Sequence, residues 1–72
     1  MEISRKYNRI SEVLAQQGRS QKWLAQQLGI SNNAMNSLCT QKSQPTLQRL
    51  MEIAQILSVD PCELLDKSIL QK

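Results

Sequence analysis

Apolar residues recur at helical spacing along most of the chain, and no segment alternates convincingly with period two. The first stripe predicts an amphipathic helix that ends before Gly18. Its start is open, because both Ser4 and Asn8 can cap a helix. The apolar positions of this stripe are Ile3, Tyr7, Ile10, Val13 and Leu14.

The stretch 20–39 carries the signals of two short helices joined by a tight turn. Ser20 is a good N-cap, Gly29 can adopt the positive φ of a helix C-cap, and Ser31 can cap the next helix. Small and aliphatic residues form the facing sides of the two helices: Leu24, Ala25, Leu28, Ile30, Met35 and Leu38. This order of signals is typical of a helix-turn-helix unit.

Two further helices are predicted downstream. Pro45 favours an extended residue before it, and Thr46 then caps a fourth helix. One face of that helix is predicted to carry Leu47, Leu50, Ile53, Ala54 and Leu57. Asp60 as N-cap, Pro61 at the first position and Glu63 in a capping box predict a short fifth helix, with Leu64 and Leu65 as its apolar residues. The fold class is therefore all-α.

The outward face of the helix predicted at Ser31–Cys39 is short, polar and uncharged: it carries Asn32, Asn33, Asn36 and Ser37. A face that only meets water would more often carry Glu and Lys, since Asn and Ser are mediocre helix formers. Asn can donate to and accept from one base edge, and it pairs well with adenine. The face therefore indicates contact with bases.

Positive charge is concentrated in the same half of the chain. The net charge is +3 at pH 7, yet from residue 3 to residue 50 seven basic residues accompany one acidic residue, Glu12. The basic residues are Arg5, Lys6, Arg9, Arg19, Lys22, Lys42 and Arg49. A polyanionic partner on that side is the simplest reason, and a solvated basic face without a partner is the alternative.

From about Asn8 to Leu65, the sequence resembles the lambda-repressor-like (Cro/repressor, or XRE-type) helix-turn-helix family of bacterial and phage regulators. The resemblance rests on Ser20–Gln21, Leu24–Ala25, Leu28–Ser31, Met35, Leu38, Gln44–Leu47, Ile53–Ala54, Leu57–Asp60 and Glu63–Leu65. It implies a compact five-helix DNA-binding domain with the helix-turn-helix at helices 2 and 3. One departure concerns the exit of the third helix, where the family often has an acidic residue, Asn and Gly and this chain has Cys39-Thr40-Gln41.

The polar face of the helix at Ser31–Cys39 and the family resemblance together indicate which residues contact DNA. Asn32, Asn33 and Ser37 fall where the family places its base-contacting residues, and Asn36 could read a base or a phosphate. Gln21 is expected to hold a phosphate, because it starts the preceding helix. Further phosphate candidates are Lys22, Thr40, Lys42 and Ser43, and the basic residues Arg5, Lys6 and Arg9 could reach flanking DNA.

Other functional classes receive little support. The chain has no His, no nucleophile–base pair, no Gly-rich phosphate loop and no clustered metal ligands, so neither an enzyme nor a cofactor or metal site is expected. Residues 1–72 are expected to form one cytoplasmic domain, with a core at about 8–65 and a tail at 66–72. Cys39 and Cys62 are expected to be free thiols, Cys39 partly exposed and Cys62 filling a small space.

Several apolar side chains allow more than one interpretation. Trp23 could be a half-buried ring against the first helix or an anchor for a partner protein. The tail residues Ile69 and Leu70 could fold back on the core, fray, or form a dimer seam with Leu64 and Leu65.

The sequence therefore predicts a sequence-specific double-stranded DNA-binding regulator of transcription, a repressor or autoregulator, which binds an inverted repeat as a homodimer through its C-terminal segment. The alternative is a DNA-binding antitoxin or a protein-binding adaptor with the same fold.

Overall fold

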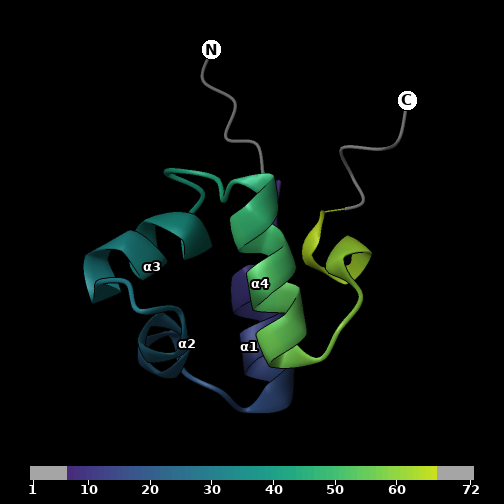
Figure 1. Ribbon diagram of the computed structural model, residues 1–72, viewed down its shortest axis with the longest axis horizontal. Coiled ribbons are helices and arrows are strands. Elements are labelled where there is room, and N and C mark those ends of the chain that lie inside the picture. Colours follow the sequence, from purple (N-terminus) through teal and green to yellow (C-terminus); the bar gives the residue numbers. More distant parts are fainter. Residues whose placement is uncertain (1–6, 67–72) are drawn as a thin grey trace.

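The computed structural model describes residues 7–66. This part of the chain contains four α-helices and one 3-10 turn, in the order α1 (Ile10–Gln17), α2 (Gln21–Leu28), α3 (Asn32–Cys39), α4 (Leu47–Leu57) and η1 (Pro61–Leu64). In Figure 1, α4 runs through the centre, α2 and α3 lie on one side of it, and η1 lies on the other. No helix within residues 7–66 is both long enough and apolar enough to cross a membrane.

The helix-turn-helix joint forms as the sequence predicts. The Ser20 hydroxyl accepts a hydrogen bond from the Trp23 N–H at 3.0 Å, and the Ser31 hydroxyl accepts one from the Ala34 N–H at 3.0 Å. Between these caps, Gly29 adopts φ 72° in the left-handed region and ends α2. The caps and the glycine together fix where each helix begins and how sharply the chain turns.

One apolar core lies between the helices. It contains Ile10, Val13 and Leu14 of α1, Leu24 and Ala25 of α2, Met35, Leu38 and Cys39 of α3, Leu50, Ile53, Ala54 and Leu57 of α4, and Leu64 of η1. Trp23 is partly buried and packs against this core, as does Leu65. The ring of Tyr7 is 43% exposed at the edge of the domain.

The first helix starts later than either predicted start. The Asn8 side chain accepts a hydrogen bond from the Ile10 N–H at 3.2 Å, and Arg9 occupies the N-cap position. Asn8 and Arg9 are drawn away from the helix, because the backbone at Asn8 pairs with Leu65 in an antiparallel bridge and the Arg9 N–H donates to the Leu64 carbonyl. Ile3 and Ser4 lie outside the described residues.

The predicted fifth α-helix is a single 3-10 turn. Its start is as predicted, since the Asp60 carboxylate accepts a hydrogen bond from the Cys62 N–H at 2.8 Å and Pro61 follows the cap. The turn stops at Leu64 because Leu65 is extended (φ −97°, ψ 140°) and enters the bridge with Asn8. Within residues 7–66 a fifth α-helix is therefore not confirmed, and a short 3-10 helix occupies its predicted place.

Two leucine assignments were also wrong. Leu47, predicted on the buried face of α4, is 75% exposed, because it is the first residue of the helix and lies beyond the core. Leu64, predicted in a dimer seam, is 0% exposed and fills the core of its own domain. Leu65 is partly buried, and Ile69 and Leu70 lie outside the described residues.

The two cysteines are placed the opposite way from the prediction. Cys39 is buried, because it follows Met35 by one helical turn on the inner face of α3, and burial raises the pKa of its thiol. Cys62 is exposed, because the tighter 3-10 turn directs Leu64 into the core and Cys62 outward.

The leucine burial predicts a contrast within one helix. Leu50→Ala should lower the free energy of unfolding by about 2–5 kcal/mol, since it leaves a cavity in the core. The matched change Leu47→Ala should cost less than about 0.5 kcal/mol, because the side chain is mostly in water. Urea denaturation followed by far-ultraviolet circular dichroism measures both, and equal losses would contradict the assignment.

The cysteine burial predicts unequal alkylation. Iodoacetamide should modify Cys62 rapidly in the native protein, whereas Cys39 should react only as fast as the domain opens, because its thiol is buried and protonated. Mass spectrometry of peptides after timed alkylation measures both rates, with urea-unfolded protein as the control in which the rates should converge. Rapid native labelling of Cys39 would show that the inner face of α3 is not closed.

Candidate nucleic-acid interface

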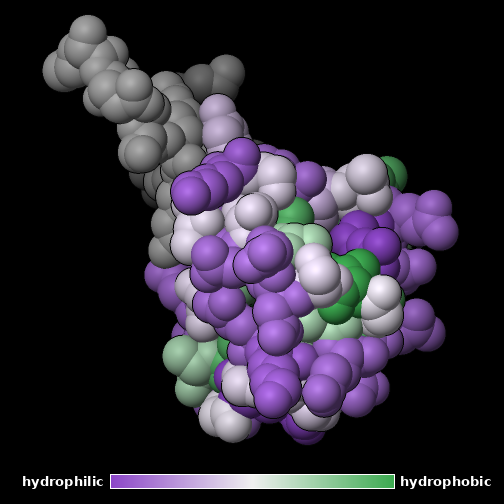
Figure 2. All heavy atoms as spheres, turned by 90° about the vertical axis from the view of Figure 1, so that its left-hand side faces the viewer, coloured by the Kyte–Doolittle hydropathy of each residue, from purple (hydrophilic) through white to green (hydrophobic). Residues whose placement is uncertain are grey.

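The helix α3 presents an amide face to solvent. Asn32, Asn33 and Asn36 are exposed and Ser37 is half-buried, while the opposite side of the helix enters the core. Within residues 7–66, the side-chain amides of the three asparagines have no hydrogen-bond partner. The side of the molecule that carries α2 and α3 is largely hydrophilic (Figure 2). These amides are therefore available to an external ligand that offers both donors and acceptors.

The N-termini of α2 and α3 add open backbone donors. Ser20 and Ser31 each cap the third residue of their helix, which leaves the first two N–H groups without an acceptor in the described part of the chain. These groups belong to Gln21 and Lys22 in α2 and to Asn32 and Asn33 in α3. Each helix end can thus donate hydrogen bonds to an anion.

The cations that lack a carboxylate partner lie beside the helix-turn-helix. Of the five within residues 7–66, Arg9 pairs with Glu12 at 3.1 Å and Arg49 pairs with Glu52 at 3.0 Å. The other three, which form no ion pair in the described region, are Arg19 and Lys22 at the start of α2 and Lys42 after α3. Within residues 7–66, positive charge therefore remains uncompensated at the start of α2 and in the loop after α3.

Arg19 is a candidate that sequence reasoning missed. Its guanidinium carbon lies 4.2 Å from the centroid of the Trp23 ring. Because that ring packs against the core, the stacking holds an exposed cation beside the start of α2. The available signal was an Arg four residues before a Trp across a helix cap.

The loop after α3 uses most of its backbone donors internally. The Thr40 hydroxyl and N–H both donate to the Asn36 carbonyl, at 2.8 and 2.9 Å, so a phosphate contact by this hydroxyl would require it to leave Asn36. The Lys42 and Ser43 N–H groups both donate to the Ser37 carbonyl, at 3.0 and 3.2 Å. Their side chains are exposed and can contact a ligand.

Arg9 is held away from this face. Besides its ion pair with Glu12, it donates a hydrogen bond to the Glu63 carbonyl at 3.3 Å, which ties it to η1. Arg5 and Lys6 lie outside the described residues.

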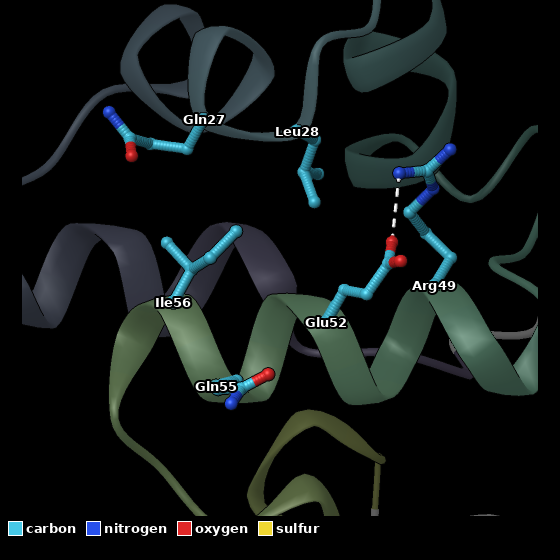
Figure 3. A pocket seen from close by; sticks show the side chains of 6 residues that line it. All are labelled: Gln27, Leu28, Arg49, Glu52, Gln55 and Ile56. Carbon is cyan, nitrogen blue, oxygen red and sulfur yellow. Dashed lines mark hydrogen bonds and ion pairs between the residues drawn. The ribbon is translucent and has the colours of Figure 1, made fainter.

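A second feature of the surface is a hollow of about 270 Å³ between α2 and α4. Figure 3 shows Leu28 and Ile56 directed into the space between the two helices, with the Arg49–Glu52 ion pair toward one end. Gln27 and Gln55 complete the lining. These six side chains include no nucleophile–base pair, and residues 7–66 contain no group of three or more potential metal ligands.

Comparison with known proteins matches this arrangement to a protein family and to a solved structure. The model of the Cro/C1-type helix-turn-helix DNA-binding domain matches residues 9–67. A crystal structure of a "putative DNA-binding protein from Bacteroides fragilis" is 45% identical, spans 83% of this chain and 97% of its own, and superposes with a TM-score of 0.82. No curated protein shows significant similarity to this chain. The family match covers most of the chain and includes α2, α3 and their capped turn, so this chain belongs to the Cro/C1-type helix-turn-helix DNA-binding domain family.

Proposed function

We propose that this protein is a sequence-specific double-stranded DNA-binding regulator of transcription. It is a bacterial or phage repressor or autoregulator that acts in the cytoplasm. The observation that carries the proposal is the exposed amide face of α3, together with cations that have no carboxylate partner within residues 7–66, at the start of α2 and in the loop after α3. Amides supply base recognition and the flanking cations supply affinity for the phosphate backbone. In this arrangement α3 enters the major groove with its N-terminal end first.

Base recognition is assigned to the amide face. Asn32, Asn33 and Ser37 read base edges, and Asn36, one turn after Asn32 and Asn33, contacts either a base or a phosphate. The side-chain amides of the three asparagines are exposed without partners in the described residues, so DNA binding does not have to break an internal hydrogen bond of those side chains.

Phosphate contacts are assigned to two groups of residues. At the start of α2, Gln21 and Lys22 combine open N–H groups with an amide and an ammonium, and the stacked Arg19 adds a cation. After α3, Lys42 and Ser43 use their exposed side chains. Thr40 contributes only if its hydroxyl leaves the Asn36 carbonyl and donates to a phosphate instead. This exchange is favourable in itself, because a phosphate oxygen is the stronger acceptor.

We further propose binding as a homodimer on an inverted repeat, because one α3 reads only a few base pairs and a twofold axis doubles the contacts. Leu64 has no part in the seam, since it is fully buried. Leu65 remains a candidate, because it is partly exposed and lines an apolar hollow of about 280 Å³ together with Tyr7 and Pro45.

A protein-binding role is the second candidate, as an adaptor or as the DNA-binding antitoxin of a toxin pair. The observation that favours it is the exposure of two large apolar side chains on α4, Leu47 at 75% and Met51 at 51%. A salt titration of binding to random duplex DNA separates the candidates. For a DNA-binding protein, the logarithm of the binding constant falls linearly with the logarithm of the salt concentration, whereas a purely protein-binding module does not bind the duplex.

The first test is Asn33→Ala. After selection of preferred sites from random duplex DNA, this change should cost about 1–3 kcal/mol on the selected site and much less on random DNA, because it removes a base contact and no phosphate contact. Fluorescence anisotropy measures both affinities. Gln55→Ala, which removes an exposed amide from α4, is the matched control and should change neither. An equal loss of affinity on the selected site and on random DNA would show that Asn33 contributes to binding of any duplex and not to sequence recognition.

The second test concerns stoichiometry. On a selected site, footprinting should show two protected half-sites about 34 Å apart along one face of the duplex, at two chains per site. Leu65→Ala should weaken binding to the full site but not to a single half-site, with thermal unfolding confirming that the variant is folded. One protected half-site at 1:1 stoichiometry, independent of Leu65, would exclude the dimer.

A further inference from the structure

The segment that follows α3 contains a non-glycine residue in the left-handed region. Gln41 has φ 69°, a backbone conformation that residues with a β-carbon rarely adopt. This is the position where the sequence departs from the resemblance, which often has a glycine after the helix. A glycine would adopt this conformation without strain, whereas Gln41 bears a strain that a favourable side-chain contact can offset.

The Gln41 amide supplies that contact by pairing with the backbone of the N-terminal segment. Its Oε1 accepts hydrogen bonds from the Tyr7 N–H at 3.0 Å and the Asn8 N–H at 3.3 Å. Its Nε2 donates to the Asn8 carbonyl at 3.0 Å. The loop after α3 is therefore joined to a segment 33 and 34 residues earlier in the chain.

Two more amides extend this contact into a cluster, here called the amide cluster: Asn8, Gln41 and Gln44. Asn8 is 2% exposed, and its Nδ2 donates to the Leu38 carbonyl at 3.0 Å and to Gln44 Oε1 at 2.8 Å. Gln44 Nε2 in turn donates to Gln41 Oε1 at 3.1 Å. No buried side-chain nitrogen or oxygen in the described residues lacks a partner, so Asn8, the buried member of the cluster, is satisfied.

The amide cluster contacts the chain before, within and directly after the loop that carries the candidate phosphate contacts. Leu38 lies in the last turn of α3, Gln41 lies inside the loop, and Gln44 follows Ser43. Lys42 and Ser43 lie between the two glutamines, and their N–H groups bond back to the Ser37 carbonyl. The place of the Lys42 ammonium relative to the amide face of α3 therefore depends on where Gln41 and Gln44 are anchored.

We propose that Gln41 is a positioning residue, which through the amide cluster holds the loop Thr40–Ser43 in the conformation that places Lys42 against a DNA phosphate. The proposal rests on the proposed function for its DNA side. The anchoring itself is a property of the free protein and can be measured without DNA.

Two variants separate the amide from the backbone conformation. Gln41→Gly removes the amide and relieves the left-handed strain, whereas Gln41→Ala removes the amide and keeps the strain. Both variants should weaken binding to random duplex DNA by about threefold to tenfold, which is the scale of one phosphate contact at about 50–200 mM salt. Wild-type affinity in Gln41→Gly would show that only the backbone conformation matters and would overturn the proposal.

The decisive readout is coupling to Lys42. In the wild-type background, Lys42→Ala should reduce the salt slope by about one unit, and in the Gln41→Gly background it should reduce the slope by less than about half of that. Lys22→Ala, on α2 and outside the amide cluster, is the matched control and should keep its full effect in both backgrounds. An unchanged effect of Lys42→Ala, or an equal decrease for Lys22 and Lys42, would overturn the proposal.

Hydrogen exchange tests the anchoring separately. The Lys42 and Ser43 amides should exchange at least about tenfold faster in Gln41→Gly than in wild type, while the Ile53 amide in α4 should be unaffected. Unchanged loop exchange would show that the amide cluster does not hold the loop. If the wild-type chain bound no duplex, the proposed function and the DNA role of Gln41 would both fall, and the exchange rates would still decide the anchoring.

Discussion

The packing of α2 against α3 determines the direction in which this protein presents its polar side chains. Ala25 of α2 is 1% exposed and Met35 of α3 is 0% exposed, so both helices give their inner faces to the core. Gly29, with φ 72°, lets the chain turn sharply between them. Because the inner face of α3 is fixed in this way, the opposite face with Asn32, Asn33 and Asn36 must face solvent. In the proposed function, affinity for DNA depends on groups that the core leaves unpaired. These groups are the open N–H groups at the starts of α2 and α3 and the cations Arg19, Lys22 and Lys42. The remaining cations of residues 7–66 are neutralised by local ion pairs within their own segments.

Local signals were sufficient to predict the helix-turn-helix joint, because each cap and turn depends on residues a few positions apart. Ser20, Ser31 and Thr46 cap the helices as predicted, and the exposed asparagines lie on the predicted face. The same local rules placed the first and last elements less well. The late start of α1 and the short η1 both result from the bridge between Asn8 and Leu65, which lie far apart in the sequence.

Two features of the site required the folded structure. The stacking of Arg19 on Trp23 spans a helix cap, and neither residue alone indicates it. The amide cluster joins Asn8 to Gln41 and Gln44 across more than thirty residues, so no periodicity or motif reports it. The sequence did show the departure at Gln41, but only the structure shows the hydrogen bonds between its side chain and the backbone of Tyr7 and Asn8.

In the proposed function, the amide face of α3 is the surface that contacts DNA. Nuclear magnetic resonance of the ¹⁵N-labelled chain, titrated with a selected duplex, tests it most directly, because the side-chain NH₂ groups of asparagine give their own signals. The NH₂ signals of Asn32 and Asn33 and the backbone signals at the start of α2 should shift on binding, while the NH₂ signals of Gln55 on α4 should stay in place. Shifts confined to the α2–α4 hollow or to the exposed residues Leu47 and Met51, with the asparagine signals unmoved, would contradict it.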